Sequence, residues 1–218
     1  MSAHPRLHRR FAYASDGIMS RHKPCHKGQE EDMDAKEIVR IGLTEYWDGL
    51  RKALSGLTAT ERRFQPHTHA NHIDFLVWHM ARDEDGEIQA FAQRTCPIWQ
   101  RDAWDQRLGL PPEDDGFGYT VEQVATLPRF DIADCLAYYE AVRRATLQYL
   151  DALTPADLDR CPDPVRRPGY TIGRTFSHLI VEGSQQLGQV AYLRGLQRGL
   201  EYPTSWVSAH TPWPDSRP

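Results

Sequence analysis

The feature that most constrains the fold is a weak internal repeat. Each half of the chain carries a long helical pattern, a turn that begins with Leu-Thr, a loop and a second long helical pattern. The stretch GLTATERRFQP (56–66) ends the first helical pattern much as ALTPADLDRCP (152–162) ends the third, and IDFLVWH (73–79) aligns with IGRTFSH (172–178). Two such halves predict an all-α fold, a four-helix bundle with a pseudo-twofold axis. In this alignment His79 and His178 are equivalent positions.

Apolar residues at helical spacing predict where the four helices lie. Asp34 and Asp131 stand before the first and third helix as N-caps, and Thr58 with Glu61 forms a capping-box pattern. Between the second and third helices, residues 97–130 are predicted to be a long irregular crossover, and its Trp and Tyr content indicates that it packs over another part of the protein. The predicted helices cover about 34–54, 71–91, 131–153 and 171–199.

One folded domain is expected at residues 33–200, between two tails. Residues 1–32 are rich in basic residues and histidine and lack apolar periodicity, so we expect a disordered tail or sequence upstream of a later start at Met19 or Met33. Its run His22-Lys-Pro-Cys25-His26 could hold a soft metal, although a disordered tail supplies no supporting shell. Residues 201–218 are expected to form a C-terminal surface tail.

Composition excludes several classes of function. The net charge of −4 over 218 residues gives no general electrostatic attraction to nucleic acid or to an anionic membrane. No apolar run approaches the roughly 18–20 residues of a membrane span, and no apolar segment follows the basic N-terminus as in a secretory signal. The four cysteines are far apart and form no CxxC pair, which is typical of reduced thiols. We therefore expect a cytoplasmic protein with no nucleic-acid or membrane partner.

The predicted fourth helix carries an unusual polar stripe. The stretch SHLIVEGSQQLGQVAYLRGL (177–196) is apolar in most directions, which predicts a buried helix. At about 100° per residue, however, four polar side chains share one stripe and a fifth lies beside it. We interpret the stripe as one wall of a metal or ligand pocket. Its members are His178, Glu182, Gln185 and Gln189, with Gln186 beside them.

Two histidines are each followed four residues later by a carboxylate on the same helix face. His79 precedes Asp83, and His178 precedes Glu182. Two such pairs on separate helices could face each other across the bundle, and bundles build metal sites in this way. The alternative is structural, because a buried histidine and a carboxylate often only satisfy each other's hydrogen bonds.

Three segments carry a resemblance to a known family: NHIDFLVWHMARDED (71–85), WQRDAWDQRLGLPPEDDGFGYT (99–120) and HLIVEGSQQLGQVAYLRGL (178–196). Together, and in this order, they resemble the DinB/YfiT-like superfamily, and most closely its branch of mycothiol-dependent enzymes such as maleylpyruvate isomerase. The resemblance covers roughly residues 34–200. It implies a four-helix bundle with a long crossover, often a homodimer, and a divalent metal held by one histidine of the second helix and two ligands of the fourth.

Carried over residue by residue, the resemblance implies a metal site of His79, Glu182 and Gln186, with Zn, Ni or Fe as the ion. Gln186 stands where the family has histidine, and its amide oxygen is a poorer zinc ligand than imidazole. His178 could replace the missing ligand or orient Glu182. Asp83 could orient His79 or accept a proton, or it could be a solvated or packing carboxylate. Asp83 and His178 are therefore the candidate catalytic residues.

The activity implied by the resemblance is transfer of a low-molecular-weight thiol, such as mycothiol, to an electrophilic small molecule, as in an S-transferase or isomerase. Two alternatives stay open. Because Gln186 weakens the ligand set, the chain could be a non-enzymatic bundle that binds a small molecule or stabilises a dimer. It could also be a metal-dependent hydrolase that uses bound water.

Several other polar and aromatic residues have two interpretations each. Glu84 and Asp85 belong to the family motif, but such carboxylates most often cap or bridge neighbouring helices. Arg194 could anchor a loop or a second subunit, or be a surface charge. His72 could lie at the mouth of the pocket or only at the start of a helix. His67 and His69 are expected to be exposed loop residues. Trp78 and Trp104 are expected to pack as anchors in the core or in a loop.

Overall fold

The computed structural model describes residues 33–199, so the predicted tails and the run from His22 to His26 lie outside the described residues. All regular structure in this part is helical, as the sequence predicts. The elements are α1 (Ala35–Leu54), α2 (Ala59–Arg62), α3 (Ile73–Asp85), the π-helix η1 (Gly86–Ala92), α4 (Ile98–Arg101), α5 (Trp104–Leu108), α6 (Val121–Ala125), α7 (Ile132–Ala152), the 3₁₀-helix η2 (Pro155–Asp159) and α8 (Ile172–Arg198).

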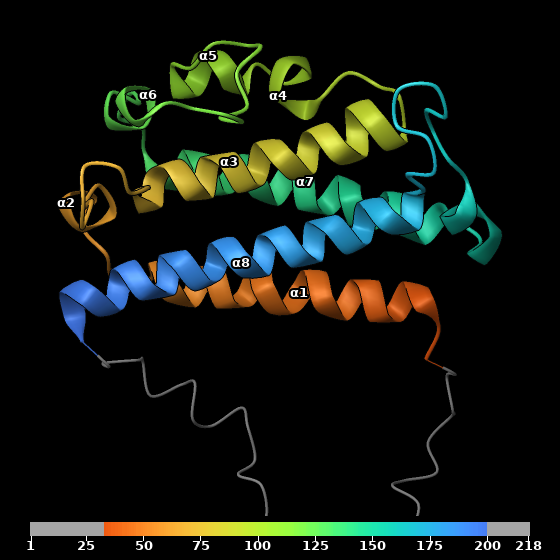
Figure 1. The fold of residues 1–218 in the computed structure, drawn as a ribbon, viewed down its shortest axis with the longest axis horizontal. Coiled ribbons are helices and arrows are strands. Elements are labelled where there is room, and N and C mark those ends of the chain that lie inside the picture. The colour runs from red at the N-terminus through yellow and green to blue at the C-terminus, as the bar shows by residue number, and fades with distance from the viewer. Residues whose placement is uncertain (1–32, 200–218) are drawn as a thin grey trace, which may run out of the picture. The chain divides into compact units, whose positions relative to one another are not determined.

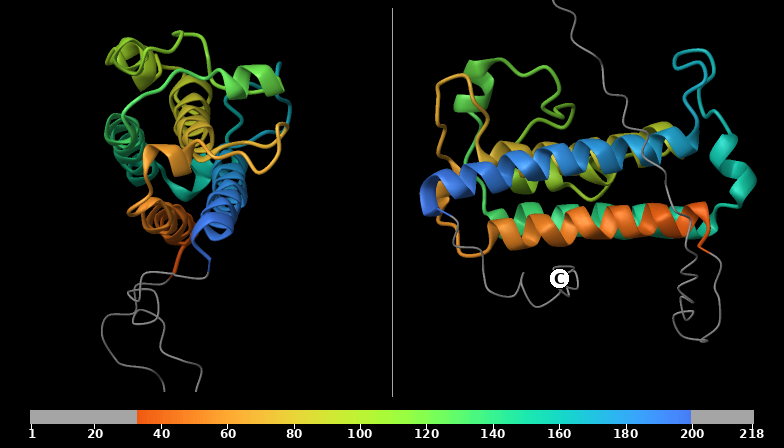
Figure 2. Two further views of the ribbon diagram at one scale, coloured as in Figure 1. Left: turned by 90° about the vertical axis from the view of Figure 1, so that its left-hand side faces the viewer. Right: turned by 60° about the horizontal axis from the view of Figure 1, so that its bottom comes forward.

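Four long helices, α1, α3, α7 and α8, form the predicted bundle (Figures 1 and 2). The helices α3 and α7 run in one direction and α1 and α8 in the other (Figure 1). The closest helix pairs are α1 with α8 and α3 with α7, and α3 also packs along α8. Each half of the chain supplies one helix to each direction, which is the arrangement expected from the internal repeat.

Local side-chain chemistry fixes the helix starts at the predicted caps. The Asp34 carboxylate accepts a hydrogen bond from the Glu37 N–H, and Asp131 accepts one from Ala133. Equivalent capping boxes follow α1 and α7, formed by Thr58 with Glu61 and by Thr154 with Asp157. The internal repeat in the sequence is thus a repeat of capping chemistry, which ends one helix and begins the next turn in each half.

Glycines let α1 and α8 approach closely. A Cβ atom at Gly183 would lie 2.8 Å from the ring of Tyr46, and one at Gly49 would lie 2.7 Å from Leu187. Tyr46 cannot move aside easily, because its hydroxyl donates to the Glu84 carboxylate over 3.0 Å and accepts from Arg143. Arg143 also pairs with Glu84 at 2.6 Å, so the interior holds a closed polar network. The bridging interpretation of Glu84 is correct.

The crossover of residues 97–130 is less irregular than predicted, since it contains α4, α5 and α6. It lies over α3 and α7 on the side away from α1 and α8 (Figure 1). Asp85 of α3 holds its beginning, because the carboxylate accepts the backbone N–H groups of Ile98 and Trp99, each over 2.9 Å. The Trp99 ring packs between Trp78 and Tyr138, with centroids 6.3 and 5.0 Å away. Asp85 therefore caps and bridges, as one interpretation proposed.

The structure also decides between the two interpretations given for His72 and for Arg194. His72 is fully buried and caps α3 through its Nδ1, which accepts the Phe75 N–H over 3.0 Å. Arg194 is an anchor and not a surface charge, because its buried guanidinium donates to the carbonyls of Ala53 and Ser55 at the end of α1. The predicted exposure of His67 and His69, and the burial of Trp78 with the half-burial of Trp104, are also found.

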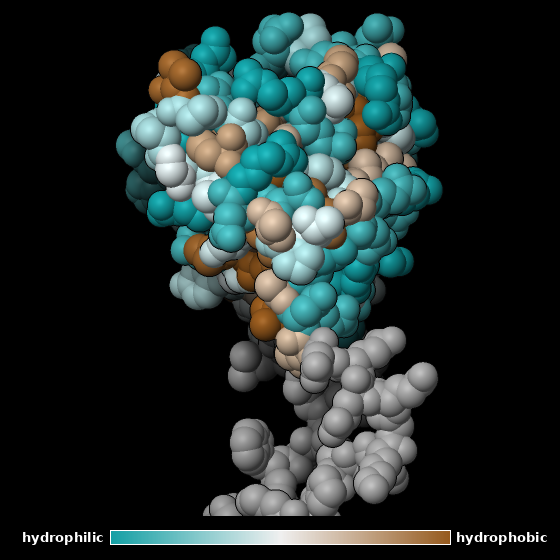
Figure 3. Space-filling model, turned by 90° about the vertical axis from the view of Figure 1, so that its right-hand side faces the viewer, coloured by the Kyte–Doolittle hydropathy of each residue, from teal (hydrophilic) through white to brown (hydrophobic). Residues whose placement is uncertain are grey.

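The prediction that α8 is buried nearly all round is wrong. Val181 is 50% exposed and Tyr192 is 67% exposed, so the helix has a solvent face with apolar side chains. Figure 3 shows the end of the molecule at which α1 and α8 begin; hydrophilic side chains predominate there, and hydrophobic ones are scattered, several of them in the lower half. Among the described residues, no helix combines the length and apolar character that a membrane span needs.

Candidate functional site

Two adjoining hollows lie where α3, α8 and the crossover meet. The first has a volume of about 250 Å³ and is lined by polar residues of α8 and by aromatic and glycine residues of α3 and the crossover. The second has a volume of about 380 Å³ and is lined largely by charged side chains. His79, Glu182 and Gln186 line both hollows. The three residues that the resemblance implies as metal ligands thus lie along the same two hollows.

His79 is held in a defined orientation. Its ring stacks on Phe75, with centroids 5.6 Å apart, and its Nδ1 lies 2.6 Å from the Asp115 carbonyl oxygen. A carbonyl oxygen can only accept, so Nδ1 carries the hydrogen and the neutral ring keeps a lone pair on Nε2. Metal-binding histidines commonly donate the N–H of one ring nitrogen to a carbonyl or carboxylate and bind the ion with the other nitrogen. His79 therefore offers Nε2 as a nitrogen ligand.

Gly116 allows the crossover to reach His79. Its φ is +83°, a left-handed conformation that favours glycine, and an added Cβ would lie 2.8 Å from Trp78 and 3.2 Å from His79 Nδ1. The adjacent Asp115 carbonyl can approach the imidazole only because residue 116 has no side chain.

Gln186 is buried, and its amide oxygen has no hydrogen-bond partner within residues 33–199. It is one of five such side-chain oxygens in the described residues, and it is the one that lies beside both His79 and Glu182 in the first hollow. The predicted polar stripe is otherwise partly wrong. Gln185 and Gln189 are exposed, whereas His178 and Glu182 are half-buried. Gln186, which was predicted at the edge of the stripe, is the buried residue, because the side of α8 that faces the core includes Gln186.

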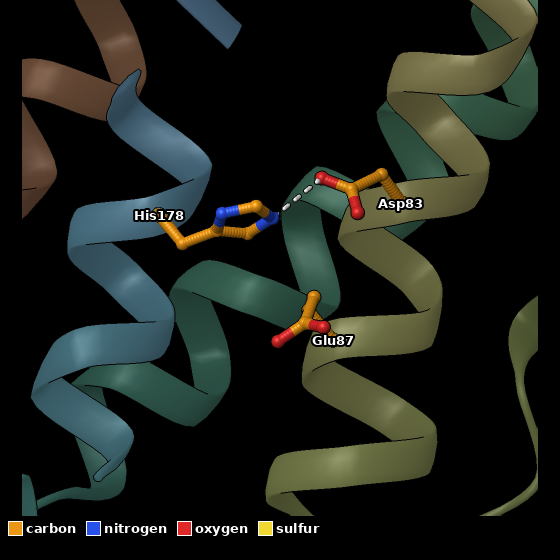
Figure 4. A group of neighbouring side chains, drawn as sticks. All are labelled: Asp83, Glu87 and His178. Carbon is orange, nitrogen blue, oxygen red and sulfur yellow. Dashed lines mark ion pairs between the residues drawn. The ribbon is translucent and has the colours of Figure 1, made fainter. Parts of the chain in front are cut away.

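His178 pairs across the helices with Asp83, not with Glu182 of its own helix. Its Nε2 lies 3.6 Å from the Asp83 carboxylate (Figure 4). This carboxylate raises the pKa of His178 above its ordinary value by favouring the protonated imidazole. Glu87 lies on the same side of α3 and η1 as Asp83, and the ligand atoms of the three side chains all lie within 4.8 Å of one another. The expected role of Asp83 in orienting His79 has no support here, because Nδ1 of His79 is bound by the Asp115 carbonyl.

Arg167 is the cation of the second hollow. Its guanidinium donates to Glu87 over 2.7 Å and packs over the rings of Tyr170 and Phe91, at 3.7 and 4.3 Å from their centroids. Four acidic residues also line the hollow: Asp83, Glu87, Glu182 and Asp115, whose carboxylate accepts the Phe117 N–H. The acidic residues of this lining outnumber its one arginine, so the hollow favours a cation.

Three of these residues were not predicted as part of the site. Glu87 follows Asp83 by four residues, and that spacing alone could have indicated it. Arg167 comes from the loop before α8, and no sequence pattern places it beside Glu87. Asp115 contributes a backbone carbonyl, which side-chain patterns do not show.

Comparison with known proteins agrees with this architecture. The model of the DinB superfamily matches residues 42–190. The chain belongs to the DinB superfamily. A solved structure, a crystal structure of a conserved protein from Enterococcus faecalis, is similar with a TM-score of 0.68. It is 23% identical and the match covers 75% of this chain and 97% of that one, so the likeness shows the fold alone. A search of curated proteins finds no match.

DinB superfamily proteins commonly bind metal, and this member has a group of histidine and carboxylate side chains in a cavity between two helices. Hollows of about 410 and 480 Å³ lie elsewhere, against the outer sides of α1, but neither is lined by histidine. The two hollows around His79 and His178 are therefore the candidate functional site.

Proposed function

We propose that this chain is a metal-dependent enzyme of the DinB superfamily that transfers a low-molecular-weight thiol to an electrophilic small molecule. His79, Glu182 and Gln186 are the proposed ligands of the ion. The observation that carries the proposal is the amide oxygen of Gln186, which is buried beside His79 and Glu182 and has no hydrogen-bond partner among the residues that the structure describes. A bound cation supplies the partner that this oxygen lacks.

The donor set fits a divalent ion. His79 offers Nε2 because Asp115 fixes the tautomer, Glu182 offers a carboxylate, and Gln186 offers an oxygen whose burial is already part of the fold. The set contains one nitrogen and two oxygen donors, which suits Zn, Fe or Ni. Three protein ligands leave room for an exogenous ligand, so the site would be catalytic rather than structural.

The remaining residues have roles in binding and proton transfer. When bound, the ion would lower the pKa of a coordinated thiol or water and so supply a nucleophile near neutral pH. The first hollow, with the rings of Phe75 and Tyr119, offers an apolar surface to the substrate. In the second hollow, Asp83 and His178 form a pair that can accept or return a proton.

Metal content is the first test. The full chain is purified without chelator, and bound metal is measured by elemental mass spectrometry for the wild type, His79→Ala and Glu182→Ala. We expect bound metal in the wild type and one equivalent fewer in each of the two variants. If the wild type holds none after incubation with Zn²⁺, Ni²⁺, Fe²⁺ or Mn²⁺, the enzyme proposal fails.

Turnover distinguishes thiol transfer from hydrolysis. Both use the same ligands, but only transfer requires an added thiol such as mycothiol. We expect activity on electrophilic substrates to depend on thiol concentration and to disappear in His79→Ala. Equal turnover with and without thiol would favour the hydrolase.

A non-enzymatic dimerising bundle is the second candidate, because apolar side chains are exposed on α1 and α8. Multi-angle light scattering tests whether the chain forms the homodimer that the family resemblance implies, and Val181→Lys with Tyr192→Lys should reduce it to monomer. Dimerisation without metal would favour this candidate. The exposed apolar residues are Ile38, Ile41, Val181, Tyr192 and Leu196.

A further inference from the structure

We infer that Asp83, Glu87 and His178 form a separate divalent-cation site, one helical turn along α3 and α8 from His79, Glu182 and Gln186. It goes beyond the proposed function, because it makes Asp83 and His178 metal ligands instead of a proton-transfer pair. The first ligand set, His79, Glu182 and Gln186, can hold or fail independently of it.

The geometry suits an ion. The ligand atoms of the three side chains lie within 4.8 Å of one another, and His178 Nε2 is 3.6 Å from Asp83 Oδ2. Metal–ligand distances of about 2.0–2.2 Å place neighbouring ligand atoms about 3.0–3.6 Å apart. Small side-chain rotations therefore bring the three ligand atoms to coordination distance of a single ion. In Figure 4, Asp83 projects toward the His178 imidazole on the facing helix, and the Glu87 side chain lies next to Asp83 on the same side of its helix.

An oxygen of Glu87 itself gives a second indication of a ligand. Glu87 Oε2 is buried and has no hydrogen-bond partner within residues 33–199. A buried carboxylate oxygen that nothing satisfies is energetically unfavourable, and a cation beside it removes the penalty.

Arg167 supports the site although it is itself a cation. It donates to Oε1 of Glu87, and its guanidinium is held over Tyr170 and Phe91. The other oxygen, Oε2, is thereby left for the ion. Carboxylates that bind metal are commonly hydrogen-bonded in this way on their other oxygen, which fixes their orientation.

The ligand types indicate the class of ion. One imidazole and two carboxylates suit a first-row divalent ion such as Zn²⁺, Fe²⁺ or Mn²⁺. The imidazole separates this site from an all-oxygen magnesium or calcium site.

The test is a titration of the full chain with Zn²⁺ and with Mn²⁺ by isothermal calorimetry. Cys25→Ser and His26→Gln are present in every protein, so that the N-terminal run does not contribute. The two variant pairs are Asp83→Asn with His178→Gln and His79→Gln with Glu182→Gln. The control pair is Glu45→Gln with Asp48→Asn, which removes two exposed carboxylates from the outer side of α1. Helix content and urea midpoint are measured for each variant before titration.

We expect the His79/Glu182 pair to keep one equivalent of metal that the Asp83/His178 pair loses, and the control pair to behave as the wild type. Arg167→Gln should weaken this equivalent by about 10-fold, because it removes the outer hydrogen bond to a ligand. Arg167→Gln also provides a readout when a ligand variant is unstable.

The two proposals fail separately. Metal lost only in the His79/Glu182 pair overturns this inference and leaves the proposed function intact. Metal lost only in the Asp83/His178 pair supports the inference and overturns the first ligand set. Loss of a single equivalent in both pairs indicates one shared site and overturns the inference, as does equal loss in the control pair. No binding in any protein overturns both proposals.

Discussion

His72 caps α3 from a fully buried position, and this placement changes its protonation. Burial lowers its pKa to about 4, and the neighbouring Arg63 contributes in the same direction. The neutral ring satisfies both of its contacts, because Nδ1 accepts the Phe75 N–H while Nε2–H donates to the Val124 carbonyl. A second proton would have to enter at Nδ1, where it would break the cap.

This gives a pH dependence with a definite sign. The pKa of His72 is about 4 when folded and about 6.5 when unfolded. Between these values only the unfolded chain binds the proton, so stability falls as pH falls from about 6.5 to 4, by up to roughly 3 kcal/mol. Above pH 7 the residue has no effect on the slope.

The check is urea unfolding of the wild type and His72→Asn at pH 7, 5.5 and 4.5. Asparagine keeps the cap but does not titrate, so we expect a smaller loss of stability with acid. Burial raises the pKa of Asp74, which acts with the opposite sign, but Asp74 is present in both proteins. Parallel pH dependence of the two proteins would contradict the role given to His72.

Substitutions at Gly116 and Gly118 distinguish the effect of backbone conformation on stability from the effect of close packing. Both have positive φ, +83° and +71°, but only at Gly116 would a Cβ meet neighbouring atoms. We expect Gly118→Ala to cost about 1 kcal/mol of unfolding free energy and Gly116→Ala about 1–3 kcal/mol more, because the loop must move away from His79. Chemical denaturation measures both, and equal losses would show that the contact with His79 is unimportant.

At the scale of helices, α8 carries another matched pair of glycines. A Cβ at Gly183 would lie 2.8 Å from the ring of Tyr46, whereas one at Gly188 would meet nothing within 4 Å. Alanine has the higher helix propensity, so Gly188→Ala should stabilise by about 0.5–1 kcal/mol. Gly183→Ala should instead destabilise by about 1–3 kcal/mol through overpacking. Thermal unfolding that moved in the same direction for both variants would contradict this account of the α1–α8 contact.

At the same scale, the sequence could predict features set by local signals but not those set by tertiary contacts. Caps at Asp34 and Asp131 and apolar periodicity are local signals, so the four long helices were placed nearly to the residue. The change from α3 to the π-helix η1 depends on tertiary packing and has no clear local signature. For the same reason the helical spacing brought His79, Asp83, His178 and Glu182 to one cavity, but it could not show that His178 pairs with Asp83 or that Arg167 reaches Glu87.

At the scale of the whole molecule, both proposed cation sites join α3 from the first half of the chain to α8 from the second. An ion that binds only the folded chain therefore opposes separation of the two halves. At a free concentration 100 times the dissociation constant, one site stabilises by about 2.7 kcal/mol. For a domain of this size that corresponds to an increase in Tm of about 5–10 °C.

We expect Zn²⁺ to raise the Tm of the wild type and EDTA to reverse the increase. Each variant pair, His79→Gln with Glu182→Gln and Asp83→Asn with His178→Gln, should retain part of the shift, because one site remains. The four substitutions together should abolish it, while Glu45→Gln with Asp48→Asn should leave it unchanged. A Tm shift that persists in the fourfold variant would mean that the ion binds elsewhere. Metal stabilisation of the bundle would then not depend on the cavity between α3 and α8.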